Sequence, residues 1–145
     1  MTMPLKTVFY TIEKTIKEYR KFSQRNLIKI EKHITVDQAL VLNILKEQPG
    51  LSQKEIAGLL YKDVAAMTRM IEGMVKKGML KKLPYPEDKR RSLIQPTDKG
   101  EAILEKIIPV VLKNRKLALE GLTEEEVHTL NALLNKILTN LNRNS

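Results

Sequence analysis

Apolar residues recur at spacings of three and four along most of the chain, and this pattern predicts helices. The first such stripe runs from Phe9 through Ile12 and Ile16, and it continues past Leu27 toward Ile30. Charged and polar residues fill the positions between. The pattern therefore predicts one long amphipathic helix in the first thirty residues.

Capping boxes mark the starts of the next two helices. Thr35 is followed three residues later by Gln38, and Ser52 is followed in the same way by Glu55. Pro49-Gly50 is expected to end the second helix. The residues predicted to face inward are Leu40, Val41, Ile44 and Leu45 in the second helix and Ile56, Ala57, Leu59 and Leu60 in the third.

A fourth helix is predicted to start at Asp63, as its cap, and to end at Gly78. The small side chain of Ala57 would let the third and fourth helices cross closely, as in a helix-turn-helix, although an ordinary helix pair in a bundle would show similar spacing. The small residues of this fourth helix would let its backbone approach a groove of DNA, and its longer polar residues would reach phosphates or base edges. The candidate DNA-binding residues here are Lys62, Asp63, Ala65, Ala66, Thr68, Arg69 and Lys76.

Two short antiparallel strands, 79–83 and 92–95, are predicted on either side of a proline-flanked loop, which would form a wing. Thr97 or Asp98 would then cap a fifth helix, and Thr123 with Glu126 would open the last. The fold class is mainly α with a small β wing. A winged helix-turn-helix region at 36–97 and a helical dimerisation region at 1–34 and 98–145 would form a single unit.

The positive charge is concentrated in two segments. Residues 1–35 hold eight Lys and Arg against three acidic residues, and residues 76–91 hold seven against two, within a net charge of +9. Such concentration favours a polyanionic partner. A solvated helix face would explain the first segment equally well, whereas the second lies in a strand and a loop.

The residues offer little for catalysis or metal binding. The chain has no cysteine, no glycine-rich phosphate loop and only two histidines, His33 and His128. Glu124 lies one turn from His128, but acidic residues at that point are what a helix start favours. We therefore expect no enzyme, no cofactor and no metal. Without an apolar membrane span or a signal peptide, the protein is expected to be cytoplasmic.

The stretch from about Thr35 to Gly100 resembles the MarR family of winged helix-turn-helix regulators. The family's wing pattern of Asp, any residue, Arg, then Leu-Thr, two residues and Gly is matched by Asp88, Arg90, Pro96, Thr97 and Gly100. The segments ITVDQALVLNIL, LSQKEIAGLL and MTRMIEGMVKKGML are also similar. Two positions depart from the pattern: Tyr61 stands where such turns usually have Gly, and Pro96 replaces Leu.

The resemblance implies a homodimeric DNA-binding regulator, commonly a repressor, that binds a palindromic operator. The implied wing contacts are Asp88, Lys89, Arg90 and Arg91, with Asp88 pairing with and orienting Arg90; a salt bridge that merely stiffens the loop is the alternative. A small aromatic or anionic effector is implied as well. Its predicted pocket is Tyr10, Tyr19 and Phe22 with Arg20 or Arg25, unless these aromatics fill the core or the dimer seam.

A different class of function remains open from the residues alone. The winged region could be a protein-interaction module, or it could bind DNA without sequence specificity as an architectural protein. Sequence preference on double-stranded DNA is the property that separates these readings.

Overall fold

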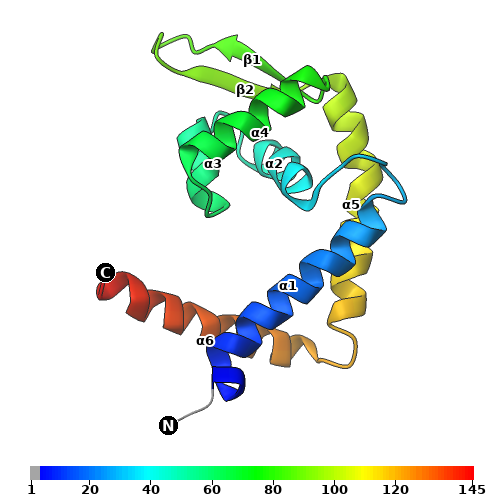
Figure 1. Ribbon diagram of the computed structural model, residues 1–145, viewed down its shortest axis with the longest axis vertical. Helices are drawn as coiled ribbons and strands as arrows, with labels where there is room; N and C mark the ends of the chain where they lie inside the picture. Colours follow the sequence, from blue (N-terminus) through cyan, green and yellow to red (C-terminus); the bar gives the residue numbers. More distant parts are fainter. Residues whose placement is uncertain (1–3) are drawn as a thin grey trace.

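The computed structural model describes residues 4–145, so the first three residues of the predicted dimerisation region lie outside it. Six α-helices and a two-stranded sheet make up the described chain (Figure 1). In chain order the elements are η1 (Pro4–Lys6), α1 (Val8–Leu27), α2 (Val36–Glu47), α3 (Gln53–Leu59), α4 (Val64–Lys76), β1 (Leu80–Pro84), β2 (Ser92–Pro96), α5 (Asp98–Ala118) and α6 (Glu124–Arg143).

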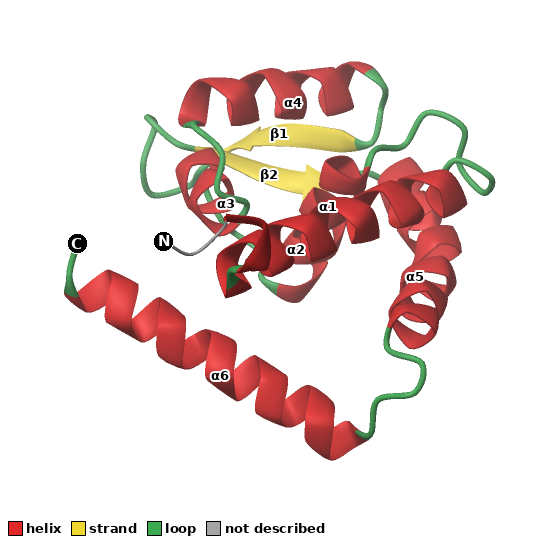
Figure 2. Cartoon of the chain, turned by 60° about the horizontal axis from the view of Figure 1, so that its bottom comes forward, coloured by secondary structure: helices red, strands yellow, loops and turns green. Residues whose placement is uncertain are grey.

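The elements gather into two regions. Helices α2, α3 and α4 lie with the β-strands at one end of the molecule, and α5 leads away from them to α6 at the other end, where α1 crosses (Figure 1). Figure 2 shows α6 standing apart from the other helices. The fold is the predicted one: mainly α, with a small β wing.

The hydrophobic core lies in the winged region and at the start of α5. Met67, Ile71 and Met74 place one face of α4 against Ile56 and Ala57 of α3, and all five side chains are buried. Close packing of this kind fixes the angle between two helices. Helix α6, in contrast, has no buried residue.

Three details of the predicted helices are wrong. Helix α1 ends at Leu27, where the backbone turns and Glu31 N–H donates to the Leu27 carbonyl, so it does not reach Ile30. In α2, Val41 and Leu45 are buried as predicted, but Leu40 and Ile44 are only half-buried, and Leu42, which was not predicted to face inward, is fully buried. In α3, Leu59 is 49% exposed, because the helix ends there and presents its last turn to solvent.

The predicted caps are confirmed. Thr35 with Gln38, Ser52 with Glu55 and Thr123 with Glu126 form reciprocal capping boxes, and two single caps, Asp63 and Thr97, start α4 and α5. Each cap satisfies a backbone N–H that the first turn of a helix leaves without a partner.

Strand β1 begins and ends one residue later than predicted, and β2 begins at Ser92 as predicted but ends one residue later. They pair in antiparallel register from Leu80 with Pro96 to Pro84 with Ser92, and residues 85–91 form the wing loop. Pro96 lies at the end of its strand, where its missing N–H costs little. Thr97 then joins the wing to α5, donating its hydroxyl hydrogen to the Gly78 carbonyl and accepting from the Gly100 N–H.

Candidate nucleic-acid interface

Helix α4 is held at its start by Asp63, whose carboxylate accepts from the Ala66 N–H at 2.7 Å. Among the predicted α4 residues, Ala65, Arg69 and Lys76 are exposed and Ala66 is half-buried. The Thr68 hydroxyl donates to the Gln53 side chain of α3 at 2.8 Å. Arg69 and, at the end of the helix, Lys76 are therefore the long, exposed donors of α4, whereas Asp63 and Thr68 act mainly to hold the helix in position.

Lys62, in the turn before α4, is engaged inside the protein. Its ammonium lies 3.0 Å from Oδ2 of Asp37, and the Arg20 guanidinium donates to Oδ1 of the same carboxylate at 2.5 Å. Asp37 thus joins α1, α2 and the helix-turn-helix turn. Burial raises the Asp37 pKa, but the hydrogen bonds from Arg20 and Lys62 outweigh it and hold that pKa below its ordinary value of 3.8.

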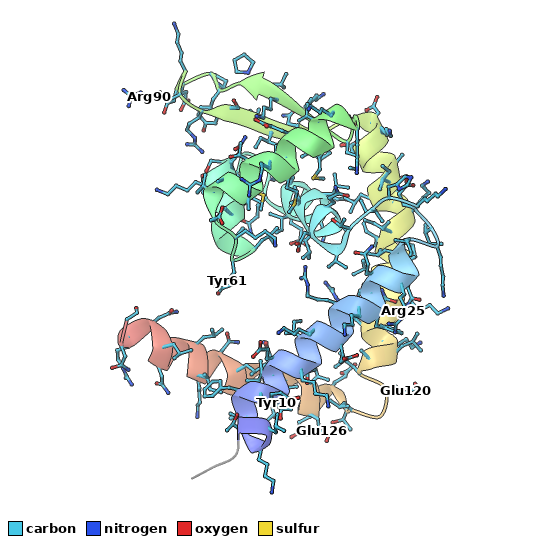
Figure 3. The ribbon with its side chains drawn as sticks, viewed as in Figure 1. Tyr10, Arg25, Tyr61, Arg90, Glu120 and Glu126 are labelled. Atoms are coloured by element: carbon cyan, nitrogen blue, oxygen red, sulfur yellow. The ribbon has the colours of Figure 1, made fainter. Side chains whose placement is uncertain are left out.

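The wing tip is a tight turn built on Asp88. Its carboxylate accepts from the backbone N–H of Arg90 at 2.9 Å, and its carbonyl accepts from the Arg91 N–H at 3.1 Å. The predicted ion pair between Asp88 and the Arg90 guanidinium is wrong, because the carboxylate is turned onto the backbone instead. Asp88 therefore shapes the tip and leaves the Arg90 side chain exposed (Figure 3). Lys89, the preceding residue in the chain, is also exposed.

Arg91 differs from its neighbours because it ties the wing to α3. Its guanidinium is 3.1 Å from the Glu55 carboxylate and 4.6 Å from the centre of the Tyr85 ring. Hydrogen bonds from the Ser52 hydroxyl and backbone N–H, with a smaller effect of the Arg91 charge, hold the pKa of Glu55 below its ordinary value. The contacts that Glu55, Tyr85 and Asp37 make with Arg91 and Lys62 were not predicted, since no local pattern indicates contacts between separate elements.

The exposed groups of this region can bind a polyanion. Arg69 on α4 and Lys89 and Arg90 on the wing are three cationic side chains without a carboxylate partner in the salt bridges of residues 4–145. Arginine can bind phosphate or a guanine edge with two parallel hydrogen bonds. The arrangement fits a helix in one groove of a duplex and a loop in the next.

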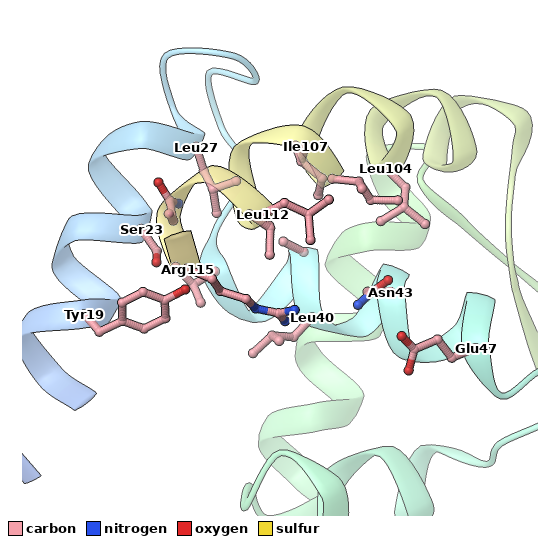
Figure 4. A pocket seen from close by; sticks show the side chains of 15 residues that line it. Tyr19, Ser23, Leu27, Leu40, Asn43, Glu47, Leu104, Ile107, Leu112 and Arg115 are labelled. Atoms are coloured by element: carbon pink, nitrogen blue, oxygen red, sulfur yellow. The ribbon is translucent and has the colours of Figure 1, made fainter. Parts of the chain in front are cut away.

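A cavity of about 280 Å³ lies between α1, α2 and α5 (Figure 4). Its walls are mostly apolar, and its polar groups include Tyr19, Asn43, Glu47 and Arg115. Asn114 also lines it; its oxygen accepts from Asn26 at 2.8 Å, while its buried side-chain nitrogen has no partner. A buried donor without a partner is costly unless a ligand or water meets it.

Of the residues predicted for an effector pocket, only Tyr19 lines this cavity. Tyr10 and Phe22 do not line the cavity, because they lie at other positions on α1 than the face that packs near α2 and α5. Arg20 is paired with Asp37 instead, and Arg25 lies with Arg20 along a separate, open surface depression. Arg115 of α5, which the sequence analysis did not single out, supplies the cationic group of the cavity.

The described residues show no group of three His, Cys, Asp or Glu side chains that could hold a metal ion. Among the same residues, no helix is long and apolar enough to cross a membrane.

Known proteins resemble this chain in sequence and in fold. A model described as the MarR family matches residues 34–92. The HTH-type transcriptional regulator YybA of Bacillus subtilis is 31% identical over 114 residues, which cover 76% of this chain and 73% of YybA. The multiple antibiotic resistance protein MarR of Escherichia coli is 37% identical over 106 residues, 72% of this chain and 74% of that protein. A mutant E. coli MarR solved in complex with operator DNA has 31% identity and a TM-score of 0.74, covering 92% of this chain and 99% of that one.

Proposed function

The chain belongs to the MarR family of DNA-binding transcriptional regulators, and from that premise we propose that it is a sequence-specific repressor, binding a palindromic operator as a homodimer. The observation that carries the proposal is the pair of exposed arginines, Arg69 on α4 and Arg90 on the wing. The residues around them are engaged in caps, turns and ion pairs that position the two elements.

In this proposal the two arginines have different tasks. Helix α4 enters the major groove, where Arg69 contacts base edges and thereby gives sequence preference. The wing reaches the flanking minor groove, where Arg90 meets a strongly negative potential. Lys89 adds attraction to phosphate without reading sequence.

The apolar surface of α6 supports a homodimer. Its exposed leucines are Leu130, Leu133, Leu138 and Leu141, and Val8, Phe9 and Ile16 of α1 are exposed at the same end of the molecule. Apolar surface of this extent marks an interface in most proteins. A second copy related by two-fold symmetry would cover it and set two α4 helices roughly 34 Å apart, in successive major grooves.

The cavity between α1, α2 and α5 supports regulation by a small effector. Its apolar walls would take an aromatic ring, and Asn114 and Arg115 would donate hydrogen bonds to an acceptor or anionic group on it. Because the cavity joins the dimer helices α1 and α5 to α2 of the winged region, occupancy can change the angle between the two α4 helices. Release of DNA would follow.

Binding of the purified protein to fragmented genomic DNA of its host, followed by sequencing of the retained fragments, tests the proposal. A regulator would retain a few discrete sites that share an inverted repeat, and Arg69→Ala would lose or change that repeat. Uniform retention across the genome would contradict sequence-specific binding and favour the architectural alternative. No retention at all would favour a protein-interaction module.

Effector binding is tested by adding small aromatic acids to the free protein and to the protein–DNA complex. A ligand of the cavity should raise the melting temperature of the free protein and weaken DNA binding, and Arg115→Ala should reduce both effects. If the acids move neither quantity, the cavity does not bind this class of compound.

A further inference from the structure

Tyr61, in the turn between α3 and α4, has a strained backbone. Its φ is +53°, the only positive φ of a non-glycine residue in the part of the chain that the structure describes. A side chain disfavours this conformation, which glycine adopts freely. Strain of this kind persists where neighbouring contacts fix the backbone, and it is found disproportionately at functional sites.

The contacts on both sides of Tyr61 hold this conformation. The Tyr61 N–H donates to the Gly58 carbonyl at 3.3 Å, and the Lys62 N–H donates to the Ala57 carbonyl at 2.9 Å. The Lys62 ammonium is also held by Asp37. The turn is therefore fixed independently of the Tyr61 side chain, and a glycine would serve the turn better.

The Tyr61 side chain contributes almost nothing to packing. It is 89% exposed, and beside it Leu59 and Val64 are each about half exposed. An aromatic ring in a strained, exposed position gives no stability to the chain itself. The ring is therefore available to a molecule that binds at this turn.

The position of Tyr61 points to DNA. Asp63, two residues later, caps α4, so the ring lies beside the start of the helix proposed to enter the major groove. Figure 3 places Tyr61 at the end of the winged region that faces α6 and Arg90 at the opposite end, with both on the same side of the view. A duplex that meets Arg90 and the start of α4 would pass Tyr61.

We propose that Tyr61 is a DNA-backbone contact whose phenol hydroxyl donates a hydrogen bond to a phosphate oxygen. This inference rests on the proposed DNA-binding function. The start of α4 carries the positive end of the helix dipole, and Arg69 is exposed further along the same helix, so a phosphate is favoured on this side of the winged region. In the proposed dimer both Tyr61 residues face the operator centre, whereas both Arg90 residues face its flanks.

Two substitutions at Tyr61 separate the contact from the strain. Tyr61→Phe removes only the hydroxyl, and we expect DNA affinity to fall about tenfold, the effect of losing a hydrogen bond to a charged group. The salt dependence should stay unchanged, because no cation is lost. Tyr61→Gly should weaken binding at least as much, yet raise the melting temperature by about 2–4 °C, since it relieves the positive φ.

Phosphate-ethylation interference on a bound duplex locates the contact. The wild type should show interference at phosphates between the half-sites that is absent with Tyr61→Phe, while interference at the flanks should remain. Wild-type affinity and an unchanged interference pattern for Tyr61→Phe would overturn the proposal. So would a lower melting temperature or a halved molecular mass for Tyr61→Gly, because the ring would then pack on protein.

Failure of the proposed function would look different. The wild type would then bind a selected duplex no better than a random one. The Tyr61 contact would still be measured, because a phosphate contact does not depend on sequence: Tyr61→Phe should weaken binding to the random duplex by the same factor, and equal affinity would reject it.

Discussion

Arg90 is presented to solvent by the backbone around Asp88. The carboxylate of Asp88 accepts from the Arg90 N–H and so is not available to neutralise the Arg90 guanidinium. The adjacent Arg91, in contrast, is paired with Glu55 and packed on Tyr85. Neighbouring cations in one loop thus differ: Arg91 fixes the wing on α3, whereas Arg90 is exposed to solvent.

Arg90→Ala should therefore weaken DNA binding about tenfold or more and reduce the slope of log affinity against log salt, while the dimer stays folded. Lys89→Ala is the matched control, because it removes one positive charge from the same tip. We expect a smaller loss from it, since an ammonium group cannot make the planar, two-donor contact of a guanidinium. If both variants lose the same DNA affinity in a salt-matched titration, Arg90 contributes only its charge and not a specific contact.

Gly100 is required at the junction of the wing and α5. A Cβ at this position would lie 2.1 Å from the Met79 carbonyl oxygen, a backbone atom that cannot move aside. Gly100→Ala should lower the free energy of unfolding by about 1–3 kcal/mol. Gly73→Ala, inside α4 with nothing within 4 Å of its Cβ, should instead raise it by about 0.5–1 kcal/mol. Urea unfolding of both variants tests the comparison, and a stable Gly100→Ala variant would contradict it.

At the scale of elements, Asp37 joins three parts of the chain that are distant in sequence. It lies in the first turn of α2 and forms ion pairs with Arg20 of α1 and with Lys62 of the turn before α4. This is the ionic link between the first helix and the helix-turn-helix. The contribution of this link to stability depends on whether the Asp37 carboxylate is ionised or protonated.

The stability that Asp37 contributes should depend on pH in a defined direction. Because its pKa is lower in the folded protein than in the unfolded chain, the contribution is present above the ordinary value of 3.8 and is lost as the pH falls through the folded pKa. Asp37→Asn should lower the free energy of unfolding by about 1 kcal/mol at pH 7, since the pair is partly exposed to solvent. The difference from wild type should vanish well below pH 4.

Glu13→Gln serves as the control for this measurement. Glu13 pairs with Lys17 on the open surface of α1, and exposed pairs of this kind contribute little. An Asp37→Asn variant that loses stability equally at pH 3 and pH 7 would show that the effect comes from the substitution and not from the ion pair.

The elements could be predicted from the sequence because their signals are local. The capping residues Thr35, Ser52 and Asp63 identify helix starts within a few positions, and Arg90 is found by its place in the wing pattern. The partners of Lys62 and Arg91 could not be predicted, since Asp37 and Glu55 lie 25 and 36 residues away in the chain. The lining of the cavity between α1, α2 and α5 could not be predicted for a related reason: Tyr10 and Phe22 share α1 with Tyr19 but do not line the cavity.

At the scale of the whole molecule, the winged region carries a core and α6 does not. No residue of α6 is buried, and its leucines are exposed over most of its length. A helix with an uncovered apolar face is stable when a partner covers it. The proposed homodimer and the proposed spacing of its two α4 helices depend on this face.

Leu133→Glu should therefore disrupt the dimer. Leu133 is 52% exposed on the apolar face of α6, and a buried unpaired carboxylate at an interface is strongly unfavourable. Light scattering should give a mass near the 16.7 kDa of one chain instead of twice that value, and DNA affinity should fall more than tenfold. Asn135→Glu, which adds the same charge on the polar side of α6, should leave both quantities unchanged. A measured mass of 16.7 kDa for the wild-type protein would contradict the proposed homodimer.

We propose that two copies of this chain bind one palindromic DNA site through α4 and the wing. Selection of bound sequences from a random double-stranded pool, at near-physiological salt so that phosphate attraction alone is penalised, tests it most directly. We expect an inverted repeat with half-sites about one helical turn apart. Recovery of no shared sequence, with binding that is unselective and lost as salt rises, would contradict the claim.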